Sequence, residues 1–246
     1  MRQLILPDNY RKEMEGWKKD CPFVFIGITT YKGELNYRLS NILMLWMARA
    51  MSKKTFKFTT AVCANHTPLD SARNSLVRKF FNEYPESTHF CLIDDDIMPF
   101  DNTLETLLDL DLDIVSPLIF TIKHDEEEVA CPAPLVFRRG ENGLELKCDL
   151  EGVVETDSIP GGFFVAKKKL MEDIRKPAFK YDYDADGVKT RGTDEYFTDR
   201  IIEAGYKMHV HSDLIVEQGL RIGGASFNMA MIRMADKLSK MGVGSA

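Results

Sequence analysis

Three consecutive carboxylates stand at the end of an apolar run. Residues 89–93 lead directly into Asp94, Asp95 and Asp96, and Pro99 follows. An apolar run that stops at a turn signal is typical of a buried strand, so we expect the acids where a strand ends. Adjacent carboxylates repel one another, and a divalent cation with oxygen ligands is the usual way to hold them together. The triplet therefore predicts a metal or phosphate site.

An acidic turn that caps the next helix is the alternative interpretation of this triplet. Asp101 is already well placed to cap a helix over residues 103–108, so the triplet is not needed for capping. Strands that end in acids also occur in P-loop NTPases. The G-x-x-x-x-G-K-S/T pattern of that class is absent from the sequence, which excludes it.

The segments up to residue 120 predict the strands and helices that position these acids. Strands are expected at 23–30, 56–63, 89–93 and 113–120, with helices at 34–51, 67–84 and 103–108. This alternation is typical of a Rossmann-like, mostly parallel α/β sheet with helices on both faces. In open sheets of this kind ligands bind beyond the carboxyl ends of the strands, which is where the acids fall.

The pattern changes after residue 120. A charge run at 124–128 predicts a loop, and the segments 135–138 and 144–147 flank a turn that contains glycine, which indicates an antiparallel hairpin. Gly161 and Gly162 precede a further apolar strand, where glycines permit either a tight turn or close approach to a ligand. The C-terminal half is therefore expected to carry antiparallel elements.

Two acids begin a later helix. Thr193 fits its N-cap, Asp194 and Glu195 its first turn, and Gly205 the position after its end. Capping and the helix dipole account for both acids without any catalytic role. A last helix at 225–241 carries an apolar stripe that favours core packing, with a homodimer contact as the alternative.

Composition limits the class of protein. The chain has 246 residues, of which 44% are hydrophobic, and a net charge of −6, so one domain is expected. A nucleic-acid binder that relied on overall charge would be basic, so contact with DNA would have to use the lysines at 53–57 or 167–169. The five cysteines form no C-x-x-C pair, and no apolar run reaches the about 18 residues of a membrane span, which predicts a cytoplasmic protein.

Five short motifs occur in an order that resembles the GT-A glycosyltransferases of the family-2-like kind. They are Ala72-Arg73-Asn74-Ser75-Leu76, Leu92-Ile93-Asp94-Asp95-Asp96, Pro160-Gly161-Gly162-Phe163, Asp194-Glu195-Tyr196-Phe197 and Gly205-Tyr206-Lys207. The resemblance covers residues 23–220 and is strongest to compact stand-alone versions from bacteriophages and bacteria. It implies the host cytoplasm as the location if a phage encodes the chain.

The resemblance implies a fold and a reaction. A single GT-A-like domain would span residues 1–246, with a nucleotide-binding half at 23–120 and an acceptor and catalytic half at 121–220. Such enzymes use Mn²⁺ or Mg²⁺ to move a hexose or pentose from a nucleotide sugar to a hydroxyl acceptor. A UDP-sugar is the favoured donor, and a glycan, a protein, a lipid or modified DNA would be the acceptor. Inversion at the anomeric carbon is expected.

The resemblance also assigns residues to the donor and the metal. Asp94 and Asp96 are implied as the outer acids of the Asp-x-Asp element, with Asp96 on the metal and Asp94 on the ribose or the metal. The nucleotide sugar is implied to contact Thr29, Tyr31, Asn65, Arg73, Asp94, Asp95, Gly161 and Gly162.

The general base is implied to be a carboxylate at a helix start. Asp194 stands three residues before the aromatic Phe197, as the base of the family does, and Glu195 is the alternative. The sequence departs from the family in having Thr193 where the first acid of the pair usually stands.

A second departure concerns the metal. Many relatives carry a histidine ligand near the end of the last core strand, where this chain has Gln218. His209 and His211 alternate on one face of the expected strand, and either would be the substitute.

Three other interpretations stay open. Asp182, Asp184, Asp186 and Gly187 match the front of an EF-hand calcium loop, but Thr193 stands at the twelfth position, where Glu is required, so a loop over the active site is favoured. A nucleotidyltransferase would also use acids and a metal, although the Gly-rich loop typical of that class is poorly matched after the first strand. A non-catalytic module would keep the nucleotide pocket without turnover.

Overall fold

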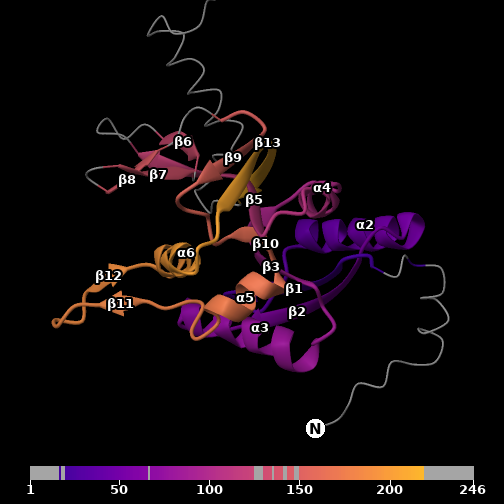
Figure 1. Ribbon diagram of the computed structural model, residues 1–246, viewed down its shortest axis with the longest axis horizontal. Coiled ribbons are helices and arrows are strands. Elements are labelled where there is room, and N and C mark those ends of the chain that lie inside the picture. The colour runs from indigo at the N-terminus through magenta and orange to yellow at the C-terminus, as the bar shows by residue number, and fades with distance from the viewer. Residues whose placement is uncertain are drawn as a thin grey trace, which may run out of the picture.

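The computed structural model describes residues 17, 20–65, 67–124, 130–134, 136–140, 143–146 and 150–218 (Figure 1). The helix predicted at 225–241, together with its dimer contact, lies outside the described residues. None of the described helices combines the length and the apolar character that crossing a membrane requires.

Within the described residues, nine strands form the central sheet, in the order β2-β1-β3-β10-β5-β13-β4, with β6 paired to β5 and β9 to β13. Their bounds are β1 Phe23–Thr30, β2 Lys57–Ala64, β3 His89–Asp94, β4 Ile97–Met98, β5 Ile114–His124, β6 Ala130–Pro134, β9 Val153–Thr156, β10 Phe163–Lys167 and β13 Met208–Gln218. Two hairpins lie outside this sheet, formed by β7 (Phe137–Gly140) with β8 (Gly143–Leu146) and by β11 (Asp182–Tyr183) with β12 (Lys189–Arg191).

The first three strands are parallel, as predicted. β1 lies between β2 and β3, and its Thr29 is aligned with Cys63 on one side and with Asp94 on the other. Because parallel strands point the same way, this register brings the carboxyl ends of all three strands to one edge of the sheet. The predicted position of the acids at a strand end is therefore confirmed, since Asp94 is the last residue of β3.

The antiparallel elements predicted for the second half are also present. β10 runs antiparallel between β3 and β5, and β7 and β8 form the expected hairpin. The loop predicted at 124–128 begins later than expected, because β6 pairs with β5 as far as His124. Residues 125–128 of that segment lie outside the described residues.

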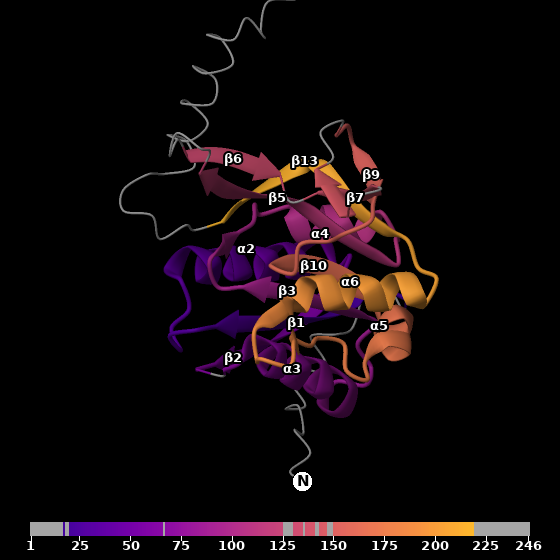
Figure 2. The same cartoon turned by 90° about the vertical axis from the view of Figure 1, so that its left-hand side faces the viewer.

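Helices cover both faces of the sheet (Figure 2). Their bounds are α2 Tyr37–Lys53, α3 Leu69–Glu83, α4 Thr103–Asp109, α5 Lys168–Ile174 and α6 Thr193–Glu203. Ile26 of β1 packs in one core with Trp46 of α2, whereas its neighbour Phe25 packs in the other core with Phe80 of α3. Each such buried side chain contributes about 1.5–3 kcal/mol. The arrangement is the GT-A-like α/β fold that the sequence predicts.

Two helix caps differ from the predictions. α4 begins after Asn102, because the carboxylate of Asp101 pairs with Arg49 of α2 instead of the helix N–H groups. The N-cap of α6 is Gly192, which makes Thr193 the first helical residue. The hydroxyl of Thr193 is thereby free to contact a side chain outside the helix.

Candidate active site

The carboxyl ends of β1, β2 and β3 bring predicted donor-binding residues to one rim. The hydroxyl of Thr29 donates a hydrogen bond to Asp94, so these two strand ends are tied together. Asn65 follows β2, and its backbone N–H donates to the carbonyl of Thr30 at 3.1 Å. Tyr31 follows β1 with 75% of its surface exposed, so its ring is available to a ligand.

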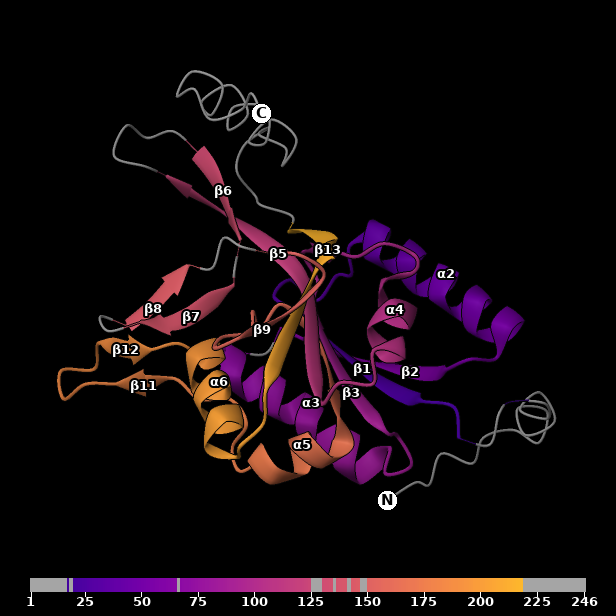
Figure 3. The same cartoon turned by 45° about the horizontal axis from the view of Figure 1, so that its top comes forward.

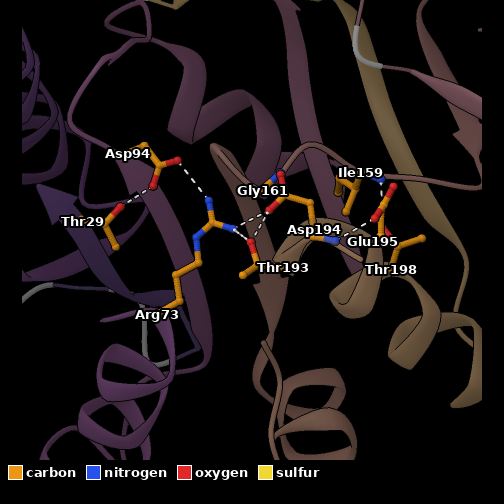
Figure 4. A network of polar contacts seen from close by, with 10 residues as sticks. Thr29, Arg73, Asp94, Ile159, Gly161, Thr193, Asp194, Glu195 and Thr198 are labelled. Carbon is orange, nitrogen blue, oxygen red and sulfur yellow. Dashed lines mark hydrogen bonds and ion pairs between the residues drawn. The ribbon is translucent and has the colours of Figure 1, made fainter. Parts of the chain in front are cut away.

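Arg73 of α3 joins the acids of the two halves of the chain (Figure 4). Its side chain is only 2% exposed, and its Nη2 donates to Asp94 at 3.0 Å. Its Nη1 donates to Asp194 and, at 2.9 Å, to the hydroxyl of Thr193. Buried guanidinium groups require such charged partners on each side. Arg73 is therefore no surface residue; it links the strand-end acids to the start of α6.

Gly161 completes the environment of Asp194. Its backbone N–H donates to the second carboxylate oxygen of Asp194 at 3.1 Å. A Cβ at this position would lie 2.2 Å from Asp194 Oδ1 and 2.7 Å from Arg73 Nη1, distances that no side chain can occupy. The glycine is thus needed for close approach of the backbone to this ion pair. At Gly162 a Cβ would be 3.3 Å from Ile97, which is only tight packing.

The two acids of α6 have different roles. Glu195 accepts the N–H of Gly192 at 2.7 Å, which is the capping interaction expected of an acid in the first turn. Asp194 instead points to Arg73 and Gly161. Helix capping therefore explains Glu195 and leaves Asp194 to be explained by the site.

The carboxylates on either side of Arg73 have pKa values shifted in opposite directions. Burial raises the pKa of Asp94, and the charge of Arg73 with the Thr29 hydrogen bond offsets this only in part. Burial acts on Asp194 too, but the charge and hydrogen bonds of Arg73 and the Gly161 N–H outweigh it, so the pKa of Asp194 lies below its usual value. Burial lowers the pKa of Arg73 and the two acids raise it; the acids have the larger effect, so its pKa lies above the usual value.

Asp96 faces the end of the last core strand. Gln218 hydrogen-bonds its carboxylate, and the pairing of Gln218 with Ile97 of β4 explains why they meet. Burial, together with the charges of Asp94 and Asp95, raises the pKa of Asp96. A cation would relieve this repulsion. Mg²⁺ is commonly held by one or two carboxylates and substrate phosphates, so the acids fit a metal whose coordination the substrate completes.

The structure does not bring His209 and His211 to these acids. His211 is aligned with Pro117 of β5, whereas Val216 is aligned with Ile119 and Gln218 lies two residues beyond. Counted along β5, His211 is therefore four residues, at about 3.3 Å each, from the position opposite Gln218. Among the residues that the structure describes, no three His, Cys, Asp or Glu side chains form a metal-binding group by themselves.

The segment that resembles an EF-hand loop is a hairpin connection. Asp182 pairs with Lys180 at 2.8 Å and with Arg191. Asp184 accepts the N–H of Val188 at 2.8 Å, which closes the turn. These carboxylates are used by the protein itself, so the calcium interpretation has no support in the geometry.

Phe179 is a residue of the site that sequence reasoning missed. Its ring lies under the guanidinium of Arg73, 5.5 Å from the Arg73 Cζ, and its carbonyl accepts the amide of Asn74 at 2.7 Å. A single aromatic residue in an irregular segment carries no signal of such a role, because the contact joins residues far apart in the chain.

Comparison with known proteins supports the fold. No family model and no curated protein sequence matches the chain. Among solved structures, it is similar to A197 from STIV, with a TM-score of 0.52, 16% identity and coverage of 79% of this chain and 84% of that one. A second structure is GalNAc-T7 with UDP, GalNAc and Mn²⁺, with a TM-score of 0.45, 12% identity and coverage of 85% of this chain and 46% of that one. A third is the mannosyltransferase PcManGT from Pyrobaculum calidifontis with GDP-Man and Mn²⁺, with a TM-score of 0.47, 15% identity and coverage of 97% of this chain and 71% of that one. Only the TM-score to A197 exceeds 0.5, and at 16% identity that likeness concerns the fold alone.

Proposed function

We propose that the chain is a metal-dependent glycosyltransferase that moves a sugar from a nucleotide sugar to a hydroxyl acceptor with inversion. The observation that carries the proposal is the bridge through Arg73, which holds Asp94 of β3 and Asp194 of α6 in one site. The inverting, metal-dependent reaction proposed here uses acids that hold the donor and a base on the acceptor side, and these must lie close together because both reactants have to be oriented together. In this proposal one domain holds the nucleotide with residues 23–120 and the acceptor with residues 121–220.

The donor is proposed to lie along the rim of β1, β2 and β3. In this proposal Tyr31 and Asn65 contact the base of the nucleotide, and a UDP-sugar is the favoured donor. Asp94 and Asp95 accept hydrogen bonds from the ribose hydroxyls. Gly162, whose Cβ position is close to Ile97, keeps a side chain out of the space beside Asp94.

The metal is proposed to be Mn²⁺ or Mg²⁺, held by Asp96 with the diphosphate of the donor. When bound, it neutralises the charge that develops on the leaving nucleoside diphosphate. Gln218 orients the Asp96 carboxylate through their hydrogen bond. Asp94 has both oxygens bound to Thr29 and Arg73, so a role on the metal requires it to exchange one of these partners.

Asp194 is proposed as the general base. Its side chain is 45% exposed, so an acceptor hydroxyl has access to it. Its lowered pKa keeps it ionised at neutral pH, although it also makes Asp194 a weaker base than a free carboxylate. As the acceptor oxygen bonds to the anomeric carbon, its proton passes to Asp194 and the bond to the diphosphate breaks. Glu195 is the alternative base, although its carboxylate is engaged in capping.

The decisive experiment is a donor screen by thermal shift and turnover. UDP-, GDP-, CMP- and dTDP-sugars are tested with and without Mn²⁺ on the wild type, on Asp96→Ala and on the control Asp109→Ala, which removes an exposed acid of α4. We expect metal-dependent stabilisation and slow hydrolysis of one class of donor. Both should be lost in Asp96→Ala and kept in Asp109→Ala.

Other outcomes of the screen separate the competing functions. Release of pyrophosphate from a nucleoside triphosphate and a sugar phosphate would identify a nucleotidyltransferase. Donor binding without hydrolysis or transfer would favour a non-catalytic module. Absence of stabilisation by every donor contradicts the proposal.

A further inference from the structure

The β11–β12 hairpin projects from the body of the molecule (Figures 1 and 3). Every residue from 183 to 190 is exposed, including Tyr183 at 57% and Val188 at 61%. A two-stranded hairpin is marginally stable by itself in water, and large apolar side chains gain no burial on such an arm. The exposed side chains of this arm are available to a molecule that binds along it.

The arm is fixed in shape despite its exposure. At the tip, Asp184 accepts the N–H groups of Asp186 at 3.0 Å and Val188 at 2.8 Å. At the base, Asp182 pairs with Lys180 at 2.8 Å and with Arg191. A binding surface that is already ordered loses less conformational entropy when its ligand arrives.

The base of the arm is fastened to α6, the helix that begins at Thr193 and carries Asp194. Arg191 pairs with Asp199 at 2.7 Å, and its guanidinium lies 4.8 Å from the centre of the Tyr196 ring. Asp199 and Tyr196 both belong to α6, so Arg191 joins the arm to this helix. Whatever lies along the arm is therefore held at a fixed position relative to the proposed base.

Two tyrosines mark a path from the site to the tip of the arm. The N–H of Tyr181 donates to Asp70 of α3 at 3.4 Å. Burial raises the pKa of the Tyr181 hydroxyl, with smaller, mutually opposing effects from the charges of Arg73 and Asp194. Tyr183 is two residues further on, at the end of β11. The two ring centres are 6.3 Å apart.

We propose that this arm binds the acceptor and that the acceptor is a saccharide whose rings pack on Tyr181 and Tyr183. The inference rests on the function proposed above and adds its substrate class. The apolar face of a sugar ring packs on an aromatic ring by dispersion, and its hydroxyls match the mixture of acids and bases beside the tyrosines.

The charges favour a saccharide over a polyanion such as DNA. The arm from 180 to 191 has three cationic and three acidic residues, so its net charge is zero. Three of the lysines considered for DNA are in ion pairs: Lys53 with Glu105, Lys167 with Asp111 and Lys169 with Asp173. Nucleic-acid binding depends on positive charge that is not paired within the protein, and these contacts reduce it.

The test uses the full chain with the donor found in the screen. Transfer is measured to neutral mono- to tetrasaccharides, a Ser/Thr peptide, a lipid alcohol and an oligonucleotide containing hydroxymethylcytosine. Binding of the same saccharides is followed separately by saturation-transfer NMR. The variants are Tyr183→Ala, Tyr183→Phe, which keeps the ring, and the control Met47→Ala on the exposed side of α2, where the side chain is 55% exposed.

We expect transfer to a saccharide, with KM raised about tenfold in Tyr183→Ala and within twofold of wild type in Tyr183→Phe and Met47→Ala. Transfer only to the peptide, the lipid alcohol or the oligonucleotide overturns the inference, as does a saccharide KM that Tyr183→Ala leaves unchanged. Hydrolysis of the donor by the wild type without acceptor tests the proposed function independently. Hydrolysis without saccharide binding therefore rejects only the inference.

Discussion

The strand-end acids of β3 and the first turn of α6 share one arginine but differ in electrostatics. Asp94 is 23% exposed, and burial raises its pKa by more than the charge of Arg73 and the hydrogen bond of Thr29 lower it, so its pKa is raised. Asp194 is 45% exposed and receives Arg73, Thr193 and the Gly161 N–H, so its pKa is lowered. The difference shows that a shared counter-ion does not make two carboxylates equivalent. The other hydrogen-bond donors around each carboxylate decide the direction in which its pKa is shifted.

This difference agrees with the two proposed roles. A base must be ionised before the acceptor arrives; the donors around Asp194 keep it ionised, and they also make it a weaker base than a free carboxylate. The ionised form of an acid at the nucleotide is instead stabilised by hydrogen bonds from the bound substrate. The pKa of Asp94 can therefore be raised in the protein without substrate. Substitutions on the two sides of Arg73 should therefore have different kinetic effects.

The largest expected effect separates the acids by kinetics. Asp194→Asn should lower kcat for transfer by about 10³-fold, because it removes the proton acceptor, with donor affinity kept. Asp94→Asn should mainly raise the donor KM, by about tenfold or more, since it removes a charged hydrogen-bond acceptor. Steady-state kinetics with donor and acceptor varied separately measure both values.

The opposite pattern would reverse the assignment of the two acids. Glu195→Gln is the matched control, because it neutralises the adjacent acid of the same helix. Loss of kcat in Glu195→Gln, with Asp194→Asn active, would identify Glu195 as the base. Equal effects of Asp94→Asn and Asp194→Asn on donor KM would remove the distinction between donor and acceptor sides.

Removal of the shared arginine is expected to have the next largest effect. Arg73→Met leaves two partly buried carboxylates without their counter-ion and should lower the free energy of unfolding by about 3 kcal/mol. Arg73→Lys keeps the charge but cannot donate to both acids at once, so it should recover only part of this loss. Urea unfolding at pH 7 measures the difference. Arg138→Met, an exposed arginine on β7, is the control, and an equal effect there would contradict the bridge.

The fold could be predicted from the sequence in its local elements but not in the pairing of distant strands. The parallel strands, the helices on both faces and the acids at the end of β3 follow from local periodicity and turn signals, and they are confirmed. The meeting of Asp96 with Gln218 depends on the pairing of β13 with β4, which joins distant segments. Local sequence does not determine that register.

The histidines illustrate the same limit. Alternation placed His209 and His211 on one face of a strand, which the strand assignment bears out. The irregular register between His211 and Ile215 then changes which residues of β13 continue to the acids. An irregularity of this kind has no clear signature in one sequence, so the residue that reaches Asp96 could only be found from the fold.

Gly161 allows the acceptor side to be disturbed without changing any charge. Gly161→Ala would force Asp194 away from Arg73, because the new Cβ lies 2.2 Å from Asp194 Oδ1, and we expect transfer to fall by about 30-fold. Gly162→Ala, with its nearest contact at 3.3 Å, leaves Asp194 in place and adds a methyl group only on the donor side, so it should retain most activity when the donor is saturating. Transfer assays under saturating donor measure both. Full activity of Gly161→Ala would show that the position of Asp194 is unimportant.

The smallest expected effect is a pair of pH profiles with opposite sign. Because the pKa of Asp194 is lowered on folding, its ionised form stabilises the protein above the ordinary carboxyl pKa of about 3.9, and this stabilisation is lost as pH falls through the lowered value. The pKa of Asp94 is raised, so its contribution to stability declines as pH rises from about 3.9 through the raised value.

Unfolding free energies of the wild type, Asp94→Asn and Asp194→Asn between pH 3 and pH 7 measure these contributions. Relative to wild type, Asp194→Asn should become less stable as pH rises and Asp94→Asn more stable, each by about 1 kcal/mol, because both side chains are partly exposed. Profiles of the same sign would mean that Arg73 dominates both carboxylates equally. The additional donors at Asp194, the Gly161 N–H and the Thr193 hydroxyl, would then have no part in distinguishing the base from the donor-side acid.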